Sequence, residues 1–159
     1  MTDVVVAGFA RSPFHFAREG ALVDVRSDDL GARVVAALLE RTGIEPAQIE
    51  DIVMGCSYPE AQQGHNVARI IGFLAGFGDT FPGMTINRFR GASMSAVHYA
   101  AGQIALGLGD AFVCGGIESM TNVPQGGFNR SPNPVLQRDF PDAYVPMGSQ
   151  PRTSPVNIA

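Results

Sequence analysis

The segment INRFRGASMSAVHYAAGQIALGLGDAFVCGG, from Ile86 to Gly116, joins a strand-like stretch to a helix-like stretch through a turn. Arg90 lies in that turn, and the residues from Gly91 to Gly109 include no Asp, Glu, Lys or Arg. The start of a helix presents free backbone N–H groups, which favour an anion or a thiolate. An arginine has the wrong sign for this position. The first question of the sequence is therefore what residue 90 does there.

The other residues that could do chemistry do not form a recognisable site. His15, His65 and His98 are too scattered to suggest a metal site, and His98 is interpreted as a packing residue. Cys56 and Cys114 end apolar runs and are interpreted as small buried hydrophobic residues, with a disulfide or a catalytic role as the less favoured alternatives. The segment GLGDAF has the glycines of a dinucleotide fingerprint in the wrong structural order. We expect no metal and no bound cofactor.

Length and composition indicate a globular chain with a sizeable core. The chain has 159 residues, of which 45% are hydrophobic and 16% are charged. Its net charge of −4 argues against nucleic acid or an anionic membrane surface as partner. The apolar run after Asp3 is too short for a signal peptide, and no run reaches the roughly twenty residues that span a bilayer. We expect a cytoplasmic protein.

Apolar periodicity predicts four strands that alternate with three helices. The expected strands cover residues 4–10, 52–55, 84–88 and 111–115, and the expected helices cover residues 28–42, 66–75 and 91–109. This alternation is typical of an α/β sheet layered with helices. The uncharged third helix should be buried on every side, so we expect a second sheet or a second subunit against it. Residues 122–155 lack periodicity and predict a functional loop, disorder or an unrecognised element.

Several motifs, taken in order, resemble the thiolase family of acyl-CoA acyltransferases. They are VMGCSYPEAQQGHNVARIIGFLAG, NRFRGASMSAVHYAAGQIALG, VCGGIESMTNVP and AYVPMG, and the resemblance extends from Val4 to Gly148. It implies the αβα-layered N-terminal half of a thiolase fold, with residues 1–116 as the core. Residues 117–148 resemble the start of the loop domain that covers the coenzyme A site. The family fold has two similar halves, and we expect the second to be missing from this chain.

The resemblance also implies the chemistry expected at residue 90. The family nucleophile is a cysteine in an Asn-Arg-Phe-Cys-Gly-Ser-type motif; Asn87, Arg88, Phe89 and Gly91 match that motif, and Arg90 replaces the cysteine. A cysteine at a helix start has a lowered pKa and accepts an acyl group from its coenzyme A thioester. An arginine stays protonated, overpacks a tight turn and, when buried unpaired, costs several kcal/mol. The less favoured alternative is that Arg90 binds a phosphate or carboxylate.

We therefore expect a thiolase-like chain that does not catalyse thiolytic cleavage or Claisen condensation by itself. The backbone N–H of Arg90 resembles an oxyanion donor, and Met147 matches a pocket-lining methionine that contacts the acyl-CoA substrate. The family's histidine, asparagine and acid–base cysteine belong to the C-terminal half. The rival hypothesis is a non-catalytic half-subunit that pairs with an intact thiolase or a separately encoded second half. Either hypothesis predicts a homo-oligomer or an assembly with a thiolase-like chain. The resemblance implies a role in fatty-acid, ketone or steroid side-chain metabolism.

Residues 149–159 depart from the family pattern. The family continues with a Thr-Ala-Glu-Asn-Val-Ala-like helix start, whereas this chain continues with SQPRTSPVNIA. Permitted codons, read in a shifted frame from residue 147 onward, allow GQPTANLAREYR, which resembles the family's helix start. The hypothesis is that residues 149–159 are an out-of-frame tail.

Overall fold

Three parallel strands and four α-helices organise residues 3–145, the part of the chain that the computed structural model describes. The sheet has the order β2-β1-β3, with β1 at Asp51–Gly55, β2 at Met84–Ile86 and β3 at Phe112–Gly116. The helices are α1 (Ser27–Thr42), α2 (Val67–Leu74), α3 (Ala92–Ala105) and α4 (Pro134–Asp139). One compact unit ends at Phe128, and a second begins at Asn129.

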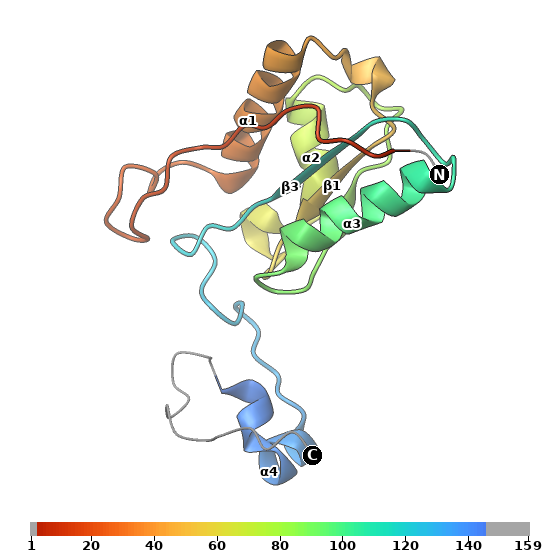
Figure 1. Cartoon of the computed structure of the whole chain (residues 1–159). Coiled ribbons are helices and arrows are strands. Elements are labelled where there is room, and N and C mark those ends of the chain that lie inside the picture. The colour runs from red at the N-terminus through yellow and green to blue at the C-terminus, as the bar shows by residue number, and fades with distance from the viewer. Residues whose placement is uncertain (1–2, 146–159) are drawn as a thin grey trace. The chain divides into compact units, whose positions relative to one another are not determined.

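Helices cover both faces of the sheet (Figure 1). Ile52 and Met54 of β1 belong to the hydrophobic cluster shared with α1 and α2. Val53 and Gly55 alternate with them and face α3, because successive strand residues point to opposite faces. A strand buried on both faces reads as a continuous apolar run, as the IVMG segment does. The predicted α/β class and the αβα layering are confirmed.

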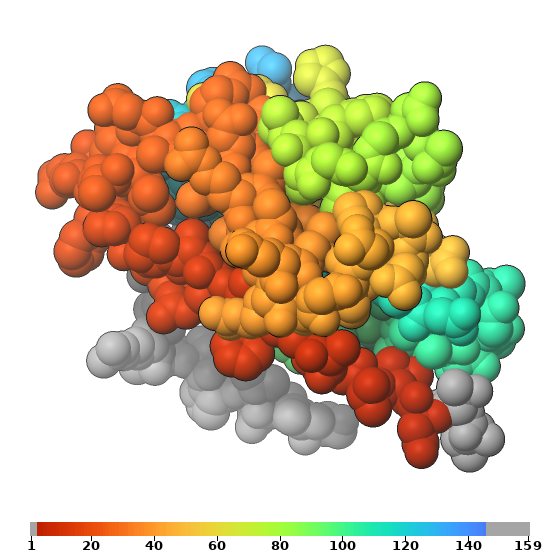
Figure 2. Space-filling model, turned by 90° about the horizontal axis from the view of Figure 1, so that it is seen from above, coloured from red at the N-terminus to blue at the C-terminus, as the bar shows by residue number. Residues whose placement is uncertain are grey.

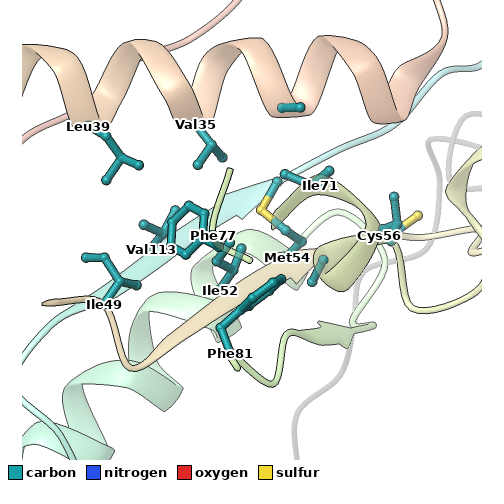
Figure 3. Packing of buried hydrophobic residues seen from close by; sticks show 13 residues of the cluster. Val35, Leu39, Ile49, Ile52, Met54, Cys56, Ile71, Phe77, Phe81 and Val113 are labelled. Atoms are coloured by element: carbon teal, nitrogen blue, oxygen red, sulfur yellow. The ribbon is translucent and has the colours of Figure 1, made fainter. Parts of the chain in front are cut away.

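The core lies between the sheet and the pair α1 and α2. Figure 3 shows Val35 and Leu39 of α1 directed toward the side chains of the sheet and of the loop that follows α2. Ile52 and Ile71 are completely buried at its centre. Burial of one such aliphatic side chain stabilises the fold by about 1.5–3 kcal/mol, so this cluster supplies much of what holds the first unit together.

The predicted helices and strands after residue 27 are present, with shifted ends. Asp28 and Asp29 occupy the first turn of α1 and Arg41 its last turn, which suits the helix dipole. Gly43 ends α1 in the left-handed conformation, with φ of 69°, as expected for a C-terminal glycine. The third helix is shorter than the predicted 91–109, because the chain turns after Ala105 and Gly107 adopts φ of 72°.

The predicted buried strand at residues 4–10 is wrong. These residues adopt no regular structure, and the side chains of Val5 and Val6 are 78% and 82% exposed. The segment touches α1 near its end, where Arg41 donates a hydrogen bond to the Phe9 carbonyl oxygen at 2.9 Å. Figure 2 shows it on the surface beside α1. A β-branched run becomes a strand only with a neighbouring strand to pair with, and none pairs with it among residues 3–145.

The stretch predicted to lack periodicity contains a short helix, α4, and a 3₁₀ turn at Pro141–Tyr144. Asn133 caps α4, because its side-chain oxygen accepts hydrogen bonds from the N–H groups of Val135 and Leu136. Proline as the first helical residue needs no N–H partner, which favours a helix start here. The expected domain boundary after residue 116 stays a prediction. Among residues 3–145, no helix has the length and apolar character required to cross a membrane.

Candidate functional site

The carboxyl ends of the three parallel strands meet at one edge of the sheet. The segments that leave this edge are residues 56–58 after β1, residues 87–91 after β2 and residues 117–119 after β3. In open parallel sheets, ligands bind outside the carboxyl ends of the strands. Residue 90, identified from the sequence as the candidate site, therefore lies where the architecture favours one.

A tight turn carries residue 90 from β2 into α3. The Asn87 side-chain oxygen accepts a hydrogen bond from the Phe89 N–H at 2.8 Å, and Phe89 has a left-handed φ of 47°. The Arg88 carbonyl oxygen accepts from the Gly91 N–H at 3.0 Å. Gly91 occupies the N-cap position of α3, and no side chain accepts a hydrogen bond from the first N–H groups of the helix. The turn thus places residue 90 directly before an uncapped helix start, the arrangement that stabilises negative charge.

Two glycines let α3 approach the sheet at this edge. Gly55 ends β1 and Gly116 ends β3, and a Cβ atom on either glycine would collide with the first turn of α3. The backbone of the first turn of α3 therefore packs directly against the strand ends, with no side chain between them. This close contact determines where residue 90 lies.

Arg90 itself is exposed, which corrects the expectation of a buried unpaired charge in an overpacked turn. The turn lies on the surface of the described part of the chain, so the guanidinium reaches solvent and the large cost of burying a charge does not arise. Among residues 3–145, no ion pair involves Arg90. Met147, the other candidate site residue, lies outside the described residues.

Neither cysteine is suited to act as a nucleophile. Both are free thiols; Cys56 is buried, as predicted, and Cys114 is half-buried. Burial, together with the smaller effect of the Glu118 charge at Cys56 and of the Asp51 charge at Cys114, raises the pKa of each thiol to about 11. A thiol with such a pKa is protonated at neutral pH, and only the thiolate attacks a thioester.

The histidines are no nearer to forming a site than the sequence suggested. The interpretation of His98 as a packing residue is wrong, because His98 is exposed on α3. It lies on the face of the helix opposite Ala96 and Ala100, which are buried. No group of three His, Cys, Asp or Glu side chains within residues 3–145 could hold a metal ion.

Sequence analysis assigned no role to Gln63 and Glu118, which the fold brings together at this edge. Gln63 is completely buried, and its amide nitrogen donates a hydrogen bond to a Glu118 carboxylate oxygen at 2.7 Å. The second Glu118 oxygen accepts from the Ser57 N–H, also at 2.7 Å. The one available signal was position, since Ser57 and Glu118 each lie just beyond the end of a predicted strand.

One face of α3 is exposed, so the expectation of a helix buried on every side does not hold within residues 3–145. Ala92, Ala96 and Ala100 meet the sheet, whereas Met94 and Val97 point away from it and are 65% and 46% exposed. The apolar side chains of Leu106 and Leu108, just after the helix, are also exposed. The second sheet or subunit expected over this face stays a prediction.

Comparison with known proteins identifies the family. The N-terminal domain of thiolases matches residues 4–149. The chain is 43% identical over 148 residues to a 3-ketoacyl-CoA thiolase of Bacillus subtilis, covering 93% of this chain and 38% of that protein. It is 42% identical over 147 residues to a 3-ketoacyl-CoA thiolase of Saccharophagus degradans, covering 92% of this chain and 37% of that one. It thus spans less than two fifths of the length of these relatives.

A solved structure supports the same assignment. The crystal structure of the Bacillus anthracis acetyl-CoA acetyltransferase superposes with a TM-score of 0.68 at 34% sequence identity, covering 74% of this chain and 29% of that one. The family match extends over nearly the whole chain, and the parallel sheet and its helices have a counterpart in this enzyme. The chain therefore belongs to the thiolase family, whose N-terminal domain it matches.

Proposed function

We propose that this chain contributes the nucleophile-bearing half of a thiolase-type acyl-CoA acyltransferase site, and that arginine at residue 90 prevents it from forming the acyl-enzyme. The observation that carries the proposal is the location of Arg90. It lies in the turn between β2 and α3, directly before the uncapped start of α3. The family resemblance assigns this position to a cysteine, and no other thiol in residues 3–145 has the pKa required to take over.

The chemistry expected at this position shows what arginine removes. A thiolate before α3 attacks the carbonyl carbon of an acyl-CoA, and the coenzyme A sulfur leaves with the electron pair of the broken C–S bond. Backbone N–H groups stabilise the negative oxygen of the intermediate, and the N–H of residue 90 is the donor that we propose from this chain. An arginine side chain keeps that N–H and loses the attacking sulfur.

The substrate class and location are part of the same proposal. The curated relatives are named 3-ketoacyl-CoA thiolases and the solved relative an acetyl-CoA acetyltransferase, so we propose an acyl-CoA substrate and a role in fatty acid metabolism. We also propose that residues 117–148, including Met147, contact coenzyme A. The proposed location is the cytoplasm.

The test measures cleavage of acetoacetyl-CoA by free coenzyme A. We expect no turnover from this chain and none from Arg90→Cys alone, because the acid–base groups of the family belong to its other half. Arg90→Cys mixed with a separately produced C-terminal thiolase half should show turnover, whereas Arg88→Cys, a thiol two residues away in the same turn, should not. Turnover by the unmodified chain would overturn the proposal.

A second candidate function is a non-catalytic partner subunit, and the exposed face of α3 favours it. Met94, Val97, Leu106 and Leu108 expose apolar side chains on or beside a helix that contains no Asp, Glu, Lys or Arg. Exposed apolar surface of this kind marks an interaction site in many proteins. Mixing the chain with a purified intact 3-ketoacyl-CoA thiolase distinguishes the two functions. A stable complex with altered thiolase turnover supports the partner role, and separate elution in size-exclusion chromatography contradicts it.

A further inference from the structure

A series of hydrogen bonds connects all three strand ends to the turn that carries residue 90. The Ser57 N–H, after β1, donates to Glu118, after β3, at 2.7 Å. The Ser57 carbonyl oxygen accepts from the Asn87 side-chain nitrogen, after β2, at 2.8 Å. The Asn87 oxygen in turn accepts from the Phe89 N–H at 2.8 Å. Each link joins a side chain to backbone, and together they lead from β3 to the residue before Arg90.

The Glu118 end of the series is anchored in the interior. Its other oxygen accepts from the Gln63 amide nitrogen at 2.7 Å, and Gln63 is completely buried. The same amide donates to the Tyr58 carbonyl oxygen at 2.9 Å, and its oxygen accepts from the Ser119 N–H. Gln63 therefore fixes the Glu118 carboxylate from one side, and the carboxylate fixes Ser57 from the other.

At the other end of the series, the backbone conformation of Phe89 determines the direction in which the chain enters residue 90. Phe89 adopts φ of 47°, which a residue with a Cβ atom adopts only when its surroundings hold it there. The hydrogen bond from its N–H to Asn87 and the contact of its ring with Tyr58, at 6.1 Å between centroids, are the interactions that do so. Both lead back to residues 57 and 58.

We propose that Glu118 and Asn87 are positioning residues, which act through Ser57 to hold the β2–α3 turn so that the side chain at residue 90 faces the start of α3. The inference rests on the proposed function for the importance of residue 90. It does not require turnover, because the position of a side chain at a helix start is read from the ionisation of a thiol placed there.

The experiment introduces Arg90→Cys into the full chain and measures the rate of iodoacetamide alkylation at position 90 against pH, with the modified residue identified by mass spectrometry. We expect a profile midpoint below 8.5, the ordinary value for a cysteine thiol. Adding Glu118→Gln should move the midpoint upward and lower the rate at pH 7 about two- to fivefold, because one of the two oxygens that accept from Gln63 and Ser57 becomes an NH2 group, which cannot accept.

Glu118→Gln distinguishes a positioning role from a simple effect of charge, because the two predict opposite changes in the pKa of the thiol at position 90. Removing a nearby negative charge lowers the pKa of a thiol and speeds alkylation at pH 7. The loss of a positioning contact raises the pKa and slows it. The matched control is Glu60→Gln, since Glu60 also accepts a backbone N–H, that of Phe128 at 2.6 Å, without belonging to the series. Glu60→Gln should leave the profile unchanged.

Asn87→Ala provides a second variant and tests whether Asn87 and Glu118 act through the same series of hydrogen bonds. It should slow alkylation by a similar factor, and the double variant with Glu118→Gln should be no slower than the slower single variant, because both act through Ser57. Circular dichroism establishes that each variant is folded. A parent midpoint at 8.5 or above, an unchanged or faster Glu118→Gln, or additive effects in the double variant would overturn the proposal. Absence of thiolase turnover bears only on the proposed function.

Discussion

Gly55 at the end of β1 lies against the backbone of Ser93 in the first turn of α3. A Cβ atom on Gly55 would come within 2.4 Å of the Ser93 nitrogen and 2.5 Å of the Ala92 carbonyl carbon. Backbone atoms cannot move aside as the end of a flexible side chain can. The start of α3 can therefore occupy this position only because residue 55 has no Cβ atom.

The first prediction follows from this contact. Gly55→Ala should lower the free energy of unfolding by about 1–3 kcal/mol, because α3 must shift away from the sheet. Urea unfolding measures the change. Gly102→Ala, in the middle of α3, is the matched control, because a Cβ atom at this position would have no neighbour within 4 Å. This variant should stabilise the protein by about 0.5–1 kcal/mol. A stable Gly55→Ala would show that α3 is not fixed at this point.

The second prediction concerns alkaline pH. Because burial raises the pKa of Cys56 to about 11 in the folded state, the Cys56 thiol of the unfolded chain loses its proton first as the pH rises. The free energy of unfolding should be unaffected by Cys56 ionisation below pH 9 and should fall between about pH 9 and pH 11. Cys56→Ala should reduce the slope of this decline. An identical slope with and without the thiol would contradict the raised pKa.

The third prediction contrasts two valines. Val53 is completely buried in β1, whereas Val5 is 78% exposed in the N-terminal segment. Val53→Ala should lower the free energy of unfolding by about 2 kcal/mol, since it removes buried methyl groups and leaves a cavity. Val5→Ala should change it by less than about 0.5 kcal/mol. Equal losses from the two variants would indicate that residues 4–10 are buried after all.

The fourth prediction concerns self-association through the exposed face of α3. Size-exclusion chromatography and binding of a hydrophobic dye should reveal association of the unmodified chain. Val97→Glu places a charge on this face and should shift the chain toward the monomer and weaken dye binding. Ala36→Glu, on the exposed side of α1, is the control and should change neither. A monomer that binds no dye would contradict the prediction.

Local pattern was sufficient to predict most of the first unit. The acidic first turn, the apolar face and Gly43 predicted α1 to within one residue at its start. The apolar run after Asp51 predicted β1, because a strand buried on both faces needs nothing else to distinguish it. These elements have strong signals in neighbouring residues, and their tertiary surroundings agree with those signals.

What the sequence left undetermined depends on contacts between distant segments. Val5 and Val6 have the composition of a strand, but pairing requires a neighbour that no local pattern specifies. The exposure of Arg90 could not be deduced from its charge, because it depends on which side of the turn faces solvent. The bond between Gln63 and Glu118 joins residues 55 positions apart, and polar side chains in loops carry no periodic signal of a partner.

The strand order also determines when the chain can fold. β1 is the central strand of the sheet, yet its partner β3 begins at Phe112, about 60 positions later in the sequence. Pairing the two strands therefore carries the entropic cost of closing a long loop. During synthesis, the edge of β1 that pairs with β3 stays unpaired until β3 has left the ribosome, while α1 is already available to cover one face of β1. Such late, non-local pairing slows folding and leaves an unpaired strand edge accessible to chaperones in the interval.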